Sequence, residues 1–136
     1  MSQLQLKIVT PEKEVLDESV DMVTLPSFEG ELGILPHHAN LMAKLIPGEL
    51  KIKKDGKVES LAIGGGFLQM ANNTLTIMTD LAAYESDIDE KAVEEAKKRA
   101  EMALSEKLSN EEYAETMAIL EKSLAQLKIK RRHRTR

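Results

Sequence analysis

The glycine run Gly64-Gly65-Gly66 is the first place in this sequence where residue type and spacing could do chemistry. A glycine-rich loop holds a phosphate when a helix begins directly behind it, because the free N–H groups of that helix point at the anion. Here residues 67–70, Phe-Leu-Gln-Met, predict another strand instead. The run therefore predicts a β-bulge or a close approach of two backbone segments.

Two other groups could serve metal binding or acid–base catalysis. His37 and His38 are adjacent, and adjacent residues on an extended chain point to opposite faces, so they rarely share one ion. The acids of residues 85–90 lie at an expected helix start, where capping explains them. The chain has no cysteine, no HExxH motif and no Ser/His/Asp order. The sequence predicts neither a catalytic nor a metal site.

The C-terminal end predicts electrostatic binding. The net charge is −4, yet residues 128–136 hold six of the nineteen basic side chains and no acid, which leaves 13 basic against 23 acidic residues elsewhere. Such a tail repels itself and binds an acidic partner. Its cations are Lys128, Lys130, Arg131, Arg132, Arg134 and Arg136.

Three kinds of partner could bind this tail through its charge, and they are not equally favoured. A nucleic acid is disfavoured because no aromatic residue is interleaved to stack on bases. An anionic membrane would bind only weakly, since Ile129 is the one apolar residue of the tail. An acidic protein surface is the favoured partner, and a merely solvated chain end is the remaining alternative.

Composition narrows the class of protein. The length of 136 residues allows one domain of ordinary size plus a small addition, and 42% hydrophobic with 31% charged residues is typical of a soluble globular protein. Aromatic residues make up only 3%, so the core must be aliphatic. No apolar run approaches the roughly 18 residues that span a bilayer. The first residues lack the layout of a signal or transit peptide, so we expect the chain to stay in the compartment that made it.

Residues 3–80 alternate apolar and polar side chains with a period of two. Leu4, Leu6 and Ile8 are an example, and Asp55-Gly56 and Asn72-Asn73 supply hairpin turns between such runs. The pattern predicts roughly eight to ten short strands forming an antiparallel β-sandwich or flattened barrel. We place this first domain at residues 1–84.

The periodicity changes at Ser86, after which the chain has no glycine or proline. Residues 86–89 predict an N-cap, and alanines then recur at helical spacing (Ala92, Ala96, Ala100 and Ala103). Residues 109–112 predict a capping box for a second helix, whose apolar stripe is Tyr113, Met117, Leu120, Leu124 and Leu127. The fold class is thus α+β in sequence order, with an antiparallel two-helix hairpin at residues 85–136. Because its seam is alanine, we expect the hairpin to be marginal alone and able to open.

Several motifs resemble the epsilon subunit of F-type ATP synthases, bacterial or chloroplast. They are Gly-Glu-Leu-Gly-Ile-Leu-Pro-His-His at 30–38, Ala-Asn-Leu-Met-Ala-Lys-Leu at 39–45, Pro-Gly-Glu-Leu at 47–50, Gly-Gly-Gly-Phe-Leu at 64–68 and Asp-Ile-Asp at 87–89. Their order and spacing match the family across nearly the whole chain.

The resemblance implies a non-catalytic rotor subunit of the central stalk, which couples proton translocation to ATP synthesis. Its implied partners are the gamma subunit, the ring of c subunits and the catalytic alpha and beta subunits, with contact to the membrane only through the complex. The C-terminal helices would extend and inhibit ATP hydrolysis, with the six cations of residues 128–136 meeting an acidic loop. The implied location is the cytoplasmic face of the plasma membrane, or the stromal face of the thylakoid in a chloroplast.

Some family members bind ATP on the hairpin through the motif Ile/Leu-Asp-x-x-Arg-Ala and further arginines. Here Ile88 and Asp89 match, whereas Ala92 stands at the motif arginine, and Arg99 and Lys122 are the remaining candidates. Losing the arginine removes a charge-assisted bond to phosphate worth roughly 1.5–3 kcal/mol. The resemblance therefore implies no required cofactor and at most weak binding of ATP with Mg²⁺. A small nucleic-acid- or nucleotide-binding regulatory module is the alternative function.

Overall fold

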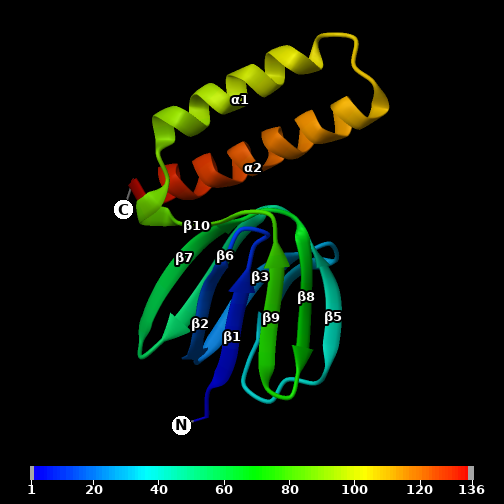
Figure 1. Ribbon diagram of the computed structural model, residues 1–136. Helices are drawn as coiled ribbons and strands as arrows, with labels where there is room; N and C mark the ends of the chain where they lie inside the picture. Colours follow the sequence, from blue (N-terminus) through cyan, green and yellow to red (C-terminus); the bar gives the residue numbers. More distant parts are fainter. Residues whose placement is uncertain (1, 135–136) are drawn as a thin grey trace.

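The computed structural model describes residues 2–134, with side chains through Arg131. A β domain is followed by a helical hairpin that lies across one end of it (Figure 1). The strands are β1 (Leu4–Val9), β2 (Glu14–Val20), β3 (Met22–Ser27), β4 (Gly30–Ile34), β5 (Leu41–Leu45), β6 (Gly48–Lys54), β7 (Lys57–Ile63), β8 (Gly66–Ala71), β9 (Thr74–Thr79) and β10 (Ala82–Tyr84). A short 3₁₀ helix η1 (Glu85–Asp87), α1 (Glu90–Leu104) and α2 (Asn110–Arg134) complete the described chain. The predicted fold class is confirmed.

The strands follow the order β10-β7-β6-β3-β5-β8-β9-β1-β2, with β4 paired to β3. An ion pair between Lys54 on β6 and Glu18 on β2 (3.5 Å) links strands from distant parts of this order, so the sheet nearly closes on itself. One pairing departs from the antiparallel prediction, because β1 runs parallel to β9. No hairpin joins those two strands, so nothing local in the sequence sets their direction.

The core lies inside the sandwich and is aliphatic, as predicted. Leu4, Leu6 and Ile8 are fully buried on β1, while Lys7 between them is exposed. The same alternation on the other strands completes a core cluster with Val20, Val23, Leu25, Ile34, Leu45, Leu50, Ile52, Leu61, Ile63, Leu68, Met70, Leu75 and Ile77. Alternation with a period of two puts every second side chain inside, which is why the strand pattern could be recognised from sequence.

Two tight turns form where they were predicted. Asp55 and Gly56, between β6 and β7, have φ values of 52° and 78°. Asn72 and Asn73, between β8 and β9, have φ values of 52° and 58°. Two successive residues with positive φ match the right-handed twist of a hairpin, and Gly, Asn and Asp tolerate that conformation best.

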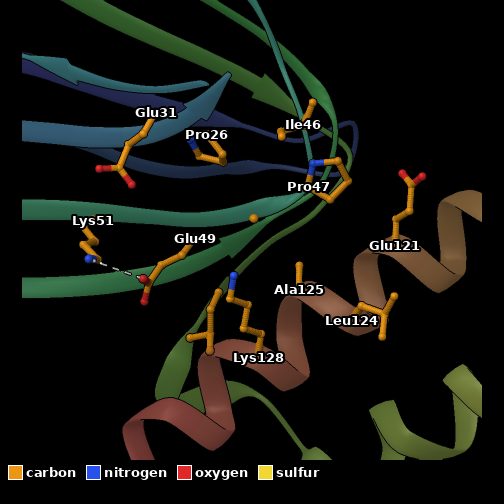
Figure 2. Close-up of a pocket in the computed structure, with 12 residues that line it drawn as sticks. Pro26, Glu31, Ile46, Pro47, Glu49, Lys51, Glu121, Leu124, Ala125 and Lys128 are labelled. Atoms are coloured by element: carbon orange, nitrogen blue, oxygen red, sulfur yellow. Dashed lines mark ion pairs between the residues drawn. The ribbon is translucent and has the colours of Figure 1, made fainter. Parts of the chain in front are cut away.

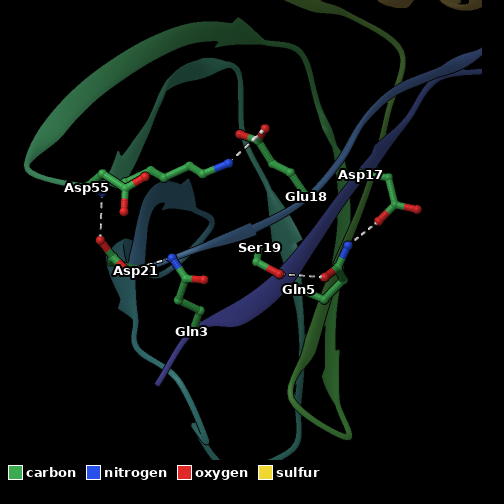
Figure 3. Close-up of polar contacts among 8 residues, drawn as sticks. Gln3, Gln5, Asp17, Glu18, Ser19, Asp21 and Asp55 are labelled. Atoms are coloured by element: carbon green, nitrogen blue, oxygen red, sulfur yellow. Dashed lines mark hydrogen bonds and ion pairs between the residues drawn. The ribbon is translucent and has the colours of Figure 1, made fainter. Parts of the chain in front are cut away.

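A polar network ties β1, β2 and the β6–β7 turn together at the end of the sandwich remote from the helices (Figures 1 and 3). The Gln3 amide donates to the Asp21 carboxylate (3.1 Å), and the backbone N–H of Asp55 donates to it as well (2.9 Å). These two bonds, the Gln3 one foremost, hold the pKa of Asp21 below its ordinary value. The network therefore stabilises the fold at neutral pH, and this stabilisation is lost as the pH falls through the lowered pKa.

The glycine run accommodates a close approach of the β9–β10 turn, which confirms that interpretation of Gly64-Gly65-Gly66. A Cβ on Gly64 would lie 2.1 Å from the Asp80 carboxylate, and a Cβ on Gly66 would lie 2.0 Å from the Met78 carbonyl oxygen. The Thr79 hydroxyl donates to the Gly65 carbonyl (3.0 Å). Since side chains at these two positions would clash with residues 78–81, Gly64 and Gly66 let this turn lie against the start of β8.

The helix boundaries follow side-chain caps. The α1 cap is Asp89, whose carboxylate accepts from the Ala92 N–H (3.2 Å), so Ser86 of the predicted cap segment lies in η1 instead. The predicted capping box is confirmed: the Glu112 N–H donates to the Ser109 hydroxyl (3.1 Å), and the Ser109 N–H donates to the Glu112 carboxylate (3.3 Å). Reciprocal bonds of this kind satisfy N–H groups that a helix start leaves without partners.

Helix α2 lies between α1 and the sandwich, and its C-terminal half contacts β6, β7 and η1 (Figure 1). Successive residues are about 100° apart around an α-helix. The buried Ser123 and Leu127 therefore share one side, and the buried Ala125 and Ile129 lie on nearly the opposite one. The predicted single stripe was wrong in part: Tyr113 and Leu124 are 52% and 47% exposed, and the side that meets the sandwich was missed.

Candidate functional site

The cationic end of α2 folds back onto acids of the same chain. The Lys130 ammonium lies 3.5 Å from the Glu85 carboxylate of η1. The Arg131 guanidinium bridges two acids of α1, at 3.3 Å from Glu90 and 2.6 Å from Glu94. In this conformation two of the six predicted inhibitory cations are paired with carboxylates that precede them by 37 to 45 positions in the sequence, so these cations already have partners within the chain.

The remaining predicted tail residues differ in placement. Lys128 is exposed and lines a crevice beside α2. Arg132 and Arg134 belong to α2 by backbone, but their side chains lie outside the described residues, as does Arg136 altogether.

Lys122, one of the candidate ATP residues, reaches the sandwich instead. Its ammonium lies 2.5 Å from the Asp80 carboxylate in the β9–β10 turn. Ile88 is 5% exposed and packs with Ala62 and Ile129, while the Asp89 carboxylate caps α1. Arg99 is exposed on α1. In this conformation Lys122, Ile88 and Asp89 each already have a structural partner.

A crevice of about 630 Å³ separates α2 from the β3 and β5–β6 region of the sandwich (Figure 2). Pro26, Ile46 and Pro47 form its sandwich wall, and Leu124 and Ala125 lie on the helix wall, as the labelled side chains show. Charges of both signs surround it, and one pair among them, Lys51 and Glu49, is 3.8 Å apart. Apolar walls with balanced charges give no single ligand class a clear advantage.

Among the side chains that the structure describes, no group of three or more His, Cys, Asp or Glu residues is placed to hold a metal ion. No helix among residues 2–134 has both the length and the apolar character to cross a membrane.

An apolar stripe crosses the outer face of β5, β8 and β9, away from the strands that α2 contacts. We define the stripe as Met42, Phe67 and Met78, which are 69%, 55% and 42% exposed. Phe67 is directly opposite Met78 on β9, whereas Met42 on β5 is opposite Gln69 and therefore lies diagonal to Phe67. The period-two pattern could have located these two methionines, since Met42 alternates with half-buried neighbours and Met78 with buried ones.

Two family models match this chain, one for the sandwich and one for the helices. The description "ATP synthase, Delta/Epsilon chain, beta-sandwich domain" matches residues 3–85, and "ATP synthase, Delta/Epsilon chain, long alpha-helix domain" matches residues 86–131. The chain belongs to the ATP synthase delta/epsilon family. The resemblance predicted from the sequence motifs is thereby confirmed.

Relatives of this delta/epsilon chain match it over nearly its whole length. An ATP synthase epsilon chain of Herpetosiphon aurantiacus is 41% identical, covering 98% of both chains. One from Dehalococcoides mccartyi is 42% identical, covering 98% of this chain and 96% of the relative. In a cryo-EM structure of the OSCP/F1/c-ring part of the Euglena gracilis mitochondrial ATP synthase, one chain is 27% identical and superposes with a TM-score of 0.73, covering 89% of this chain and 77% of that one.

We expect ATP to produce no measurable heat of binding at millimolar concentration, corresponding to a Kd weaker than about 1 mM. The physical reason is that Ala92 supplies no guanidinium, and Lys122 is already paired with Asp80. Isothermal calorimetry with MgATP measures this. The matched variant is Ala92→Arg, which restores the missing cation at an exposed position and should bring binding into range. Saturable binding by the unmodified chain would contradict the expectation.

Proposed function

We propose that this chain is a central-stalk subunit of an F-type ATP synthase, couples proton translocation to ATP synthesis, and restrains ATP hydrolysis through its C-terminal helices. The full-length match to ATP synthase epsilon chains carries the proposal, together with the likeness to a chain of the Euglena F1/c-ring assembly. The subunit itself contributes no catalytic residue in this proposal. It would sit peripherally on the cytoplasmic face of the membrane, held there by the complex.

The sandwich provides the anchor in this proposal. The stripe of Met42, Phe67 and Met78 is exposed, apolar and not covered by the hairpin, which suits a permanent contact with a partner subunit. The gamma subunit is the proposed partner of this face, with the c ring next to the sandwich and the alpha and beta subunits within reach of an extended hairpin.

The hairpin provides the restraint. Its cations are concentrated at the end of α2, and its apolar contact with the sandwich is small, so the helices can separate from the sandwich without unfolding it. Once released, Lys128, Lys130, Arg131 and the cations after them would meet an acidic loop of the catalytic subunits.

Reconstitution with an epsilon-depleted catalytic complex tests the proposal. We expect the full chain and a chain ending at Leu127 to bind, because both keep the sandwich, and only the full chain to inhibit ATP hydrolysis. Binding is measured by co-sedimentation and inhibition by the rate of phosphate release. Failure of both chains to bind would overturn the stalk assignment. Inhibition by the shortened chain would mean that the rest of the chain, and not residues 128–136, inhibits ATP hydrolysis.

A further inference from the structure

We propose that Asp80 fastens the hairpin to the sandwich, and that it forms with Glu85, Glu90 and Glu94 an intramolecular acidic latch that keeps the cations of α2 occupied. Only the identity of the surface that later competes for these cations rests on the proposed function. The latch itself is a property of the isolated chain.

Asp80 links the sandwich to the middle of α2. It follows β9 directly, and its carboxylate is 2.5 Å from the Lys122 ammonium. The side chains are 47% and 27% exposed, so the pair is partly shielded from water. It joins two segments that lie 42 positions apart in the sequence. Such a contact constrains the placement of α2 far more than a pair within one helix does.

Gly64 sets the position of the Asp80 carboxylate. A Cβ at residue 64 would lie 2.1 Å from its Oδ1 atom and 3.3 Å from Cβ of Leu81. The Gly64 N–H also donates to the Leu81 carbonyl (3.0 Å). The absence of a side chain therefore lets the acidic turn lie flat against the sandwich, with Oδ2 directed to Lys122.

The other acids hold the end of α2. Lys130 pairs with Glu85, and its ammonium also donates to the Glu85 carbonyl oxygen (3.3 Å). Arg131 is held by two carboxylates of α1 at once. All four acids come from residues 80–94 and all three cations from residues 122–131. The Asp80–Lys122 pair crosses the joint between hairpin and sandwich, the Glu85–Lys130 pair joins η1 to α2, and the two Arg131 pairs hold α2 against α1 within the hairpin.

Apolar contacts at the same joint are modest. Ile129 packs in a cluster with Ala62 and Ile88, to which Ala83 and Val93 add partly buried surface. Two of these five side chains are alanines, which remove little apolar area from water. Where apolar burial is small, a few ion pairs decide whether the helix stays docked. A carboxylate-rich partner can replace each internal acid with one of its own, so the cations never have to remain unpaired.

Hydrogen–deuterium exchange on the full-length isolated chain tests the latch. We expect Asp80→Asn to speed exchange of the α2 amides around 122–131 about twofold to fivefold, the range that loss of one partly exposed ion pair gives. Gly64→Ala should act in the same direction, because it displaces the carboxylate while keeping every charge. Adding salt to about 0.5 M should speed exchange there too, through screening.

The matched control is Glu101→Gln, which removes the Lys97–Glu101 pair within α1 and should leave α2 exchange unchanged. Slow exchange in β1 and β8 must persist in every variant, which shows that the sandwich remains folded. Unchanged α2 exchange in Asp80→Asn, or an equal acceleration in Glu101→Gln, overturns the latch. Neither outcome bears on the stalk assignment, since no other subunit is present.

Discussion

Phe67→Asp is expected to weaken binding to an epsilon-depleted catalytic complex by about thirtyfold or more, equivalent to about 2 kcal/mol. Phe67 lies at the centre of the apolar stripe, between Lys44 on β5 and Met78 on β9, and is 55% exposed in the isolated chain. An aromatic side chain at the centre of an interface contributes a large share of the binding free energy. A carboxylate at that place would be buried without a partner.

The measurement is a binding titration of labelled chain against the depleted complex. Val58→Asp is the matched control, since Val58 is 61% exposed on β7 and lies outside the stripe. Both variants should unfold thermally near the temperature of the unmodified chain, because neither side chain is part of the core. Binding by Phe67→Asp as tight as that of Val58→Asp would place the docking surface elsewhere on the sandwich.

Local chemistry explains which parts of the fold could be predicted from sequence. The Asp55-Gly56 turn and the capping box of Ser109 and Glu112 depend on residues at most three positions apart, and both form as predicted. Strand burial follows the same logic, because alternation is visible within one strand. The parallel pairing of β1 with β9 depends on segments about 70 positions apart, and nothing in either strand encodes direction.

For helix α2, the sequence pattern predicted neither the side that packs on the sandwich nor the acids that pair with its basic end. A single partner helix was assumed, so one stripe was sought, whereas the sandwich buries Ala125 and Ile129 on the other side. The basic tail was interpreted by its charge alone as a surface for a separate acidic partner. Its first partners in the folded chain are Glu85, Glu90 and Glu94, and acids spread through a helix start are explained equally well by capping. Only the three-dimensional fold shows that they also face the tail.

The two sides of the latch are expected to change inhibition of ATP hydrolysis in opposite directions. Replacing the acids (Asp80→Asn, Glu85→Gln and Glu94→Gln together) frees Lys122 and Lys130 and leaves Arg131 with Glu90 alone, without altering any cation, so a lower concentration of chain should inhibit. With three pairs each worth about 0.2–1 kcal/mol and roughly additive, the shift in half-inhibitory concentration should be about tenfold. Replacing the cations (Lys130→Gln and Arg131→Gln together) also loosens the hairpin, yet removes groups that we propose to bind an acidic loop of the catalytic subunits, so inhibition should weaken.

Phosphate release by the depleted complex, titrated with each variant, distinguishes these effects from simple loss of folding. Both variants open the latch. If the latch only stabilised the hairpin, both would shift the half-inhibitory concentration in the same direction. That result would refute competition between internal and external acids for the cations. Lys97→Gln is the control for charge, since it removes a cation that pairs within α1. Its inhibition curve should match that of the unmodified chain. Opposite shifts in half-inhibitory concentration would mean that internal carboxylates and those of the partner compete for the same cations, and that this competition regulates inhibition.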